Sequence, residues 1–279
     1  MDSDNTPSIA AQVKALSRLY THSTPPEILN TITEIASTLS NSSSNRKKRT
    51  IQPGDPLPNF TVPDVTNTPV QINTLVGHGS PALLTFYHGG WCPFDSLVLA
   101  SLQSHLDEFD ARGAAIVGIS PEPPAHLAKT AEHSRVYFPP LSDTGNRVAQ
   151  SLGLASTLRI KRHTLSAGFE SWVGAELGLP LWNYEDQDDE MVELVLSVPS
   201  TLLVDGRGIV KKMDLMEASP DFRRRLDMTT LLDWVDELLA EEEEDEKGHR
   251  ERVYRERKEE KQTVMLAVER KRGEGRGQT

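Results

Sequence analysis

The sequence is poor in cysteine and in aromatic residues, and it has no long apolar run. Its 279 residues include a single cysteine, Cys92, and aromatic side chains make up only 6%. One cysteine excludes an intramolecular disulfide and is typical of a reducing compartment, so we expect a cytoplasmic protein. No stretch approaches the roughly 18 apolar residues that a membrane-spanning helix needs. The polar start of the chain also lacks the pattern of a secretory signal.

Negative charge is concentrated in the middle of the chain. The formal net charge is −11, yet residues 1–50 contain four acidic and six basic side chains, and residues 241–279 contain 12 acidic and 11 basic ones. Residues 51–240 therefore carry essentially all of the excess negative charge. A strongly acidic domain repels phosphate backbones, so we do not expect nucleic acid to be a partner.

The composition divides the chain into three parts. Residues 1–50 predict two short helices and then a polar, basic linker, SNSSSNRKKRT. Residues 51–240 alternate between short apolar runs and helical patterns, which predicts an α/β sandwich with right-handed crossovers. Residues 241–279 begin with six consecutive acidic residues, which is typical of a solvated helix or a disordered tail.

The alternation in the central part predicts individual elements. Short apolar runs predict buried strands over 81–87 and 114–119, and a Gly-Arg-Gly turn predicts a hairpin between 199–205 and 209–213. Apolar residues at helical spacing predict helices over 93–109, 123–133, 145–152 and 231–239. We expect residues 154–196 to be less regular.

The strongest chemical signal is the segment FYHGGWCPFD, residues 86–95. A buried strand leads into two glycines and then into Cys92, and Pro93 suits the first position of a helix. This arrangement predicts that Cys92 lies at the N-cap, where free N–H groups and the helix dipole stabilise an anion. Such a setting lowers the pKa of a thiol and favours a reactive cysteine over an inert buried one.

Five further segments resemble the AhpC/TSA peroxiredoxin-like family of the thioredoxin superfamily, in the branch that carries a GGWCPxC motif. They occur in the family's order over about residues 51–240. The segments are GDPLPNFTVPDV (54–65), RGAAIVGISPEPP (112–124), FPPLSDTGNRVAQSLGL (138–154), SVPSTLLVDGRGIV (197–210) and SPDFRRRLD (219–227).

The resemblance implies a thioredoxin-like three-layer α/β/α sandwich with a mixed central sheet. It implies a thiol oxidoreductase that reduces peroxides through Cys92, with glutathione or a thioredoxin-type protein as the external reductant. No metal-ligand spacing stands out, so we expect neither a metal nor a cofactor. A homodimer is compatible with this reading.

The same motif supplies the candidate residues around Cys92. Gly89, Gly90, Trp91 and Pro93 would shape the substrate site, because the glycines permit a sharp turn and a close approach of substrate to the backbone. His88 occupies the position where the family's motif usually has arginine. It would either partner a thiolate or cap the strand end, and the sequence does not decide between the two.

Two candidates come from distant parts of the chain. Pro199 resembles the cis-proline of thioredoxins, so we expect a cis Val198–Pro199 bond next to Cys92. Trp182, in the irregular region, would line a substrate pocket or anchor its packing.

The chain departs from the family pattern at Asp95, where the branch has its second cysteine. An aspartate suits this early helical position but cannot form a disulfide with an oxidised Cys92. Its charge also opposes thiolate formation. A one-cysteine mechanism is therefore one interpretation. The alternative is a redox-inactive protein of the same fold that binds or transforms a small molecule, with Asp95 as an acid, a base or a binding group.

Overall fold

The computed structural model describes residues 7–31, 33–34, 50–77, 79–90, 92–161, 191–216, 225–245 and 247. The chain forms two compact units, Met1–Val235 and Asp236–Thr279. All of the elements that build the site described below belong to the first unit. No helix in the described ranges is long and apolar enough to cross a membrane.

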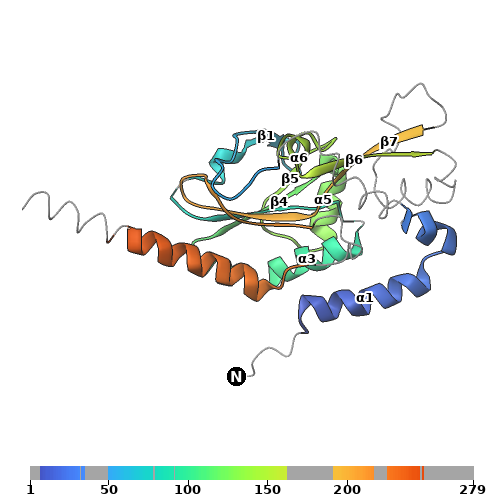
Figure 1. The fold of residues 1–279 in the computed structure, drawn as a ribbon, viewed down its shortest axis with the longest axis horizontal. Coiled ribbons are helices and arrows are strands. Elements are labelled where there is room, and N and C mark those ends of the chain that lie inside the picture. The colour runs from blue at the N-terminus through green and yellow to red at the C-terminus, as the bar shows by residue number, and fades with distance from the viewer. Residues whose placement is uncertain are drawn as a thin grey trace, which may run out of the picture. The chain divides into compact units, whose positions relative to one another are not determined.

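A mixed five-stranded sheet with the order β5-β4-β3-β8-β9 forms the centre of the first unit (Figure 1). Its first three strands run parallel, while β8 is antiparallel to both β3 and β9. This is the mixed sheet that the alternating pattern and the family resemblance predicted. The strands are β3 (Ala82–Phe86), β4 (Ala115–Ser120), β5 (Pro140–Ser142), β8 (Ser200–Val204) and β9 (Val210–Leu215).

Helices follow the parallel strands and pack back onto the sheet, as crossover connections require. Contacts join α4 to β4 and α5 to β5. The helices are α3 (Pro93–Ser104), α4 (Leu106–Ala111), α5 (Pro124–His133) and α6 (Arg147–Ser151).

The alternation of side chains along β3 gives the sheet two covered faces. Leu84 and Phe86 belong to the main apolar cluster together with Val148 of α6. Thr85, which points the other way, shares a pocket with Leu99 of α3. The sheet is therefore covered on both sides, and the fold is the predicted thioredoxin-like α/β/α sandwich. Because β3 is buried on both faces, all five of its residues are buried.

The single helix predicted over 93–109 is wrong, because the structure interrupts it at His105. The Ser101 carbonyl would normally accept the His105 backbone N–H, but it accepts Ser104 Oγ and contacts His105 Nδ1, each at 2.8 Å. The His105 N–H instead bonds to the Leu102 carbonyl. Side chains that compete for helical carbonyls in this way end a helix without any proline or glycine.

The prediction that residues 154–196 are less regular is wrong at both ends of that range. Strands β6 (Ala155–Lys161) and β7 (Met191–Ser197) pair in an antiparallel two-stranded sheet. A second small sheet, which the sequence patterns did not predict, joins β1 (Thr61–Pro63) to β2 (Pro69–Gln71).

The described part of the N-terminal extension contains helices, as predicted, while the predicted basic linker lies outside the described residues. Helix α1 (Ile9–Ser23) contacts α3, and residues 26–31 begin a second helix. The backbone N–H of Ile9 donates to Asp227 Oδ1 at 2.8 Å, so a side chain near the C-terminal helix satisfies the first N–H of α1. That C-terminal helix covers 228–245, and it begins before and ends after the predicted range of 231–239.

Candidate functional site

Cys92 is the N-cap residue of α3, as the sequence predicted. Its backbone is extended, with φ −80° and ψ 111°, and Pro93 opens the helix. The Cys92 carbonyl accepts the N–H groups of Asp95 at 3.0 Å and Ser96 at 2.9 Å, which closes the first helical turn. The side chain is buried, with 8% of its surface exposed. The thiol therefore sits at the positive end of the helix but away from water.

The two glycines before Cys92 form the tight turn that the motif predicted. Gly89 has φ 143°, which disfavours residues with a side chain, and its carbonyl accepts the Cys92 N–H at 3.0 Å. Gly90 has no room for a side chain, because an added Cβ would lie 2.4 Å from the nearest Thr130 side-chain atoms. The backbone geometry therefore favours glycine at position 89, and the packing against Thr130 requires glycine at position 90.

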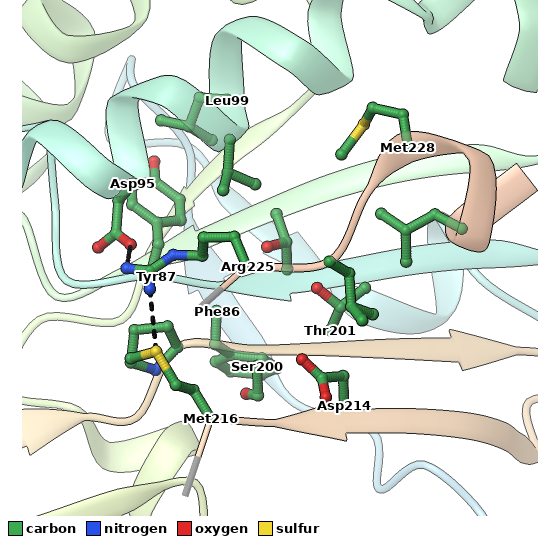
Figure 2. A pocket seen from close by; sticks show the side chains of 15 residues that line it. Phe86, Tyr87, Asp95, Leu99, Ser200, Thr201, Asp214, Met216, Arg225 and Met228 are labelled. Atoms are coloured by element: carbon green, nitrogen blue, oxygen red, sulfur yellow. Dashed lines mark hydrogen bonds and ion pairs between the residues drawn. The ribbon is translucent and has the colours of Figure 1, made fainter. Parts of the chain in front are cut away.

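Asp95 forms an ion pair with Arg225 at the edge of the pocket (Figure 2). It is only 1% exposed, and its Oδ1 lies 2.5 Å from an Arg225 nitrogen. Its Oδ2 accepts the His88 backbone N–H at 2.9 Å and lies 3.2 Å from His88 Nδ1. Arg225 and His88 outweigh the effect of burial, so the pKa of Asp95 falls well below its usual range. Asp95 is therefore an ionised counter-ion near neutral pH and cannot serve there as a general acid.

Arg225 is the functional residue that the sequence analysis missed. Its side chain is 7% exposed, donates to Asp95, and places its other terminal nitrogen 2.9 Å from Met216 Sδ. Its charge also favours the thiolate of Cys92. The signal was present in the motif SPDFRRRLD, because the family pattern that it resembles, D-P-D-Y-x-x-R-x-x, has its fixed arginine at the position of Arg225. The sequence did not connect that arginine with Asp95.

The thiol of Cys92 is held in its protonated form in this arrangement. Burial is the largest cause and the Asp95 charge is the second, and together they raise the pKa of Cys92 to about 12. Arg225 and the first backbone N–H groups of α3 act in the opposite direction but do not outweigh them. Asp95 opposes thiolate formation, as predicted. The N-cap N–H groups also lower the pKa of Cys92, as expected, but burial and the Asp95 charge outweigh them, so the expected net lowering does not occur.

His88 lies close to both Asp95 and Cys92, so it could partner a thiolate as well as cap the end of the strand. Ligand-type atoms of His88, Cys92 and Asp95 all lie within 4.8 Å of one another, a spacing that a small metal ion could bridge. However, each oxygen of Asp95 already has a partner, and the buried Arg225 cation supplies the positive charge that an ion would bring. We therefore assign no metal to this cluster.

Pro199 lies beside the site, but the predicted cis bond is wrong. The described residues contain no cis peptide bond, so the Val198–Pro199 bond is trans, as most bonds before proline are unless packing dictates otherwise. Pro199 lines one pocket with Asp95 and Arg225, between the ends of β3 and β8 and the first turns of α3. The candidates Trp91 and Trp182 lie outside the described residues.

Residues 53–213, more than half of the chain, match the model of the AhpC/TSA family. The chain belongs to the AhpC/TSA family. The family match ends before Arg225 and begins after α1. The ion pair at Asp95 therefore joins a residue inside the family's matched region to one outside it.

Individual peroxiredoxins are similar to this AhpC/TSA protein. A Mycobacterium tuberculosis protein assigned as a peroxiredoxin, Rv1608c, is 34% identical over 116 residues, which are 40% of this chain and 75% of that protein. Peroxiredoxin Bcp of Escherichia coli is 29% identical over 104 residues, which are 37% of this chain and 65% of Bcp. The structure of peroxidoxin BcpB from M. tuberculosis aligns with a TM-score of 0.48 and 23% identity, over 67% of this chain and 97% of BcpB.

The ion pair at Asp95 is expected to make the fold sensitive to acid. The folded-state pKa of Asp95 lies below its unfolded value of about 3.9, so its contribution to stability is complete above that pH and is lost as the pH falls further. We expect urea unfolding to show a larger loss of stability between pH 6 and pH 3 for the wild type than for Asp95→Asn. Equal losses in both proteins would contradict this assignment.

Proposed function

We propose that this AhpC/TSA protein is a one-cysteine peroxide reductase that uses Cys92 and an external thiol. The placement of Cys92 at the N-cap of α3, three residues before the Asp95 that pairs with Arg225 and inside the family's matched region, carries the proposal. Its relatives' description as peroxiredoxins supports a peroxide as the substrate. Asp95 replaces the branch's second cysteine, which supports a reductant that comes from outside the chain.

The proposed cycle has three steps. The Cys92 thiolate attacks one peroxide oxygen, an S–O bond forms, and the O–O bond breaks. The sulfur is oxidised to a sulfenic acid, while the other oxygen takes up a proton and leaves as water or an alcohol. A first external thiol then forms a mixed disulfide with Cys92 and releases water. A second thiol displaces Cys92 from that disulfide and leaves as the oxidised reductant.

Peroxide consumption tests this proposal directly. The assay is run with glutathione and, separately, with a thioredoxin system, beside the variant Cys92→Ser. Turnover that requires one of these reductants and disappears in the variant is the expected result. Turnover that persists in the variant, or its absence with every reductant, would contradict the proposal.

The products of oxidation are expected to be a glutathione adduct and sulfinic acid rather than a disulfide-linked dimer. Cys92 is the chain's only cysteine and is buried, so two copies of the motif would have to open before their sulfurs could meet. Intact mass after graded hydrogen peroxide, with and without glutathione, measures the three products, and Cys92→Ser is the control. A predominance of dimer would show that the site opens readily.

A second candidate function is the binding of a small molecule without redox chemistry. The pocket beside Asp95 includes Ser200, whose buried Oγ has no hydrogen-bond partner within the described part of the chain. A polar ligand that supplies this bond would bind without involving Cys92. A wild type that gains neither oxygen nor glutathione, under conditions that oxidise an exposed thiol, would favour this function.

A further inference from the structure

The carboxylate of Glu122 binds Thr130, the residue that packs against Gly90 of the glycine turn. No step of the proposed cycle uses this carboxylate. Glu122 follows β4 and is only 3% exposed. Its two oxygens accept Thr130 Oγ1 at 2.6 Å and Ser120 Oγ at 3.0 Å. Burial raises the pKa of this carboxylate, and the Gly90 backbone acts in the opposite direction. A buried carboxylate is costly unless it is well hydrogen-bonded, so the two hydroxyl donors help to offset the cost of burying it.

Gly90 is held by two contacts. Its carbonyl accepts Ser96 Oγ of α3 at 2.8 Å. The second contact is steric, because Thr130 of α5 fills the space where a Gly90 side chain would lie. Thr130 therefore limits the position of Gly90, and its own hydroxyl is held by the Glu122 carboxylate, to which it donates at 2.6 Å.

The position of Cys92 depends on this turn. Gly90 lies two residues before Cys92, and the neighbouring Gly89 carbonyl accepts the Cys92 N–H. A shift of Gly90 would thus move the residue that caps α3 and carries the thiol. Errors of about 1 Å in the position of a reacting group can cost on the order of a hundredfold in rate.

We propose that Glu122, together with Thr130, is a positioning residue that fixes Gly90 and thereby places Cys92 for reaction. The inference rests on the proposed function in one respect only, namely that peroxide is the electrophile. The positioning of the thiol applies equally to any reagent that Cys92 attacks.

The test compares two replacements of Glu122. In Glu122→Gln, the amide oxygen still accepts the Thr130 hydroxyl, so this variant recovers most of the rate. In Glu122→Leu the bonds to Thr130 and Ser120 are both lost, and we expect Cys92 to react with hydrogen peroxide and with iodoacetamide about fivefold more slowly or worse. Glu132→Gln, on the exposed part of α5, is the matched control.

A spectroscopic readout separates positioning from general destabilisation. The Gly90 amide proton resonance is expected to move strongly in Glu122→Leu, less in Glu122→Gln, and not at all in Glu132→Gln. Should Glu122→Leu fail to fold, the nearly isosteric Thr130→Val serves instead, because it keeps the packing against Gly90 and removes one donor. It is expected to slow both reactions and to move the same resonance.

Two outcomes distinguish the proposals. Unchanged Cys92 rates in a folded Glu122→Leu or Thr130→Val protein would overturn the positioning role. Slower alkylation in these variants, combined with no reaction of the wild type with peroxide, would support positioning and overturn the peroxide function alone.

Discussion

Replacing Asp95 with asparagine is expected to speed the alkylation of Cys92 at pH 7.5 by about tenfold or more. The Asp95 charge raises the pKa of Cys92, and its removal also takes away the carboxylate that pairs with Arg225, whose charge favours the thiolate. Each unit by which a thiol pKa falls gives about ten times more thiolate at a pH well below that pKa. Burial, the larger cause, does not change, so the variant should still react more slowly than an exposed cysteine. The second-order rate constant with iodoacetamide, followed by intact mass, measures the effect.

Two controls show whether a change in rate comes from the Asp95 charge itself. Asp107→Asn removes a carboxylate from an exposed position in the first turn of α4 and should leave the rate unchanged. Because breaking a buried ion pair typically costs about 3–5 kcal/mol, the Asp95→Asn rate must be taken where near-ultraviolet circular dichroism shows the variant to be folded. An unchanged rate in folded Asp95→Asn would mean that this carboxylate does not suppress the thiolate.

The rate at which hydrogen peroxide oxidises Cys92 is expected to rise about tenfold for each pH unit from pH 7 to pH 9. Because the pKa of Cys92 is raised to about 12, the thiolate is a minor species throughout this range. Its fraction therefore grows in proportion to the hydroxide concentration. Intact-mass kinetics at constant ionic strength would give the slope.

The shape of this pH profile separates two descriptions of the site. A continuous rise means that the buried Asp95 arrangement persists during the reaction. A plateau near pH 8 would mean that the thiol reacts with an ordinary pKa, in a conformation where Asp95 or the surrounding protein has moved away. In Asp95→Asn, the same profile should shift toward lower pH.

The sequence predicted the local part of the site because neighbouring residues determine it. The strand, the glycine turn and the helix that begins after Cys92 occupy one continuous segment, and each residue type suits its backbone position. The N-cap position of Cys92 and the opposing effect of Asp95 followed from that segment alone. The mixed sheet followed from the alternation of apolar runs and from the family resemblance.

Long-range contacts were the part that the sequence could not supply. Arg225 reaches Asp95 across 130 residues, and although the family motif has an arginine at this position, no sequence pattern connects it with Asp95. The rise in the pKa of Cys92 that burial causes was missed for the same reason, because burial depends on which distant residues pack over the turn. The break at His105 depends on side-chain hydrogen bonds that compete with the backbone. Pairing of β6 with β7 likewise joins segments that are distant in the sequence.

The separation of Asp95 and Arg225 also affects the order in which the site forms during synthesis. At about 5–20 residues per second, a ribosome needs roughly 7–26 seconds to add the 130 residues between them. Strand β3 precedes Asp95, and β4 and β5 are added during that interval, while the carboxylate of Asp95 still lacks its cation. Because burying an unpaired charge is unfavourable, we expect the Cys92 turn to close only after the arginine has been added. Cys92 should consequently be most accessible to modification while the chain is still being made.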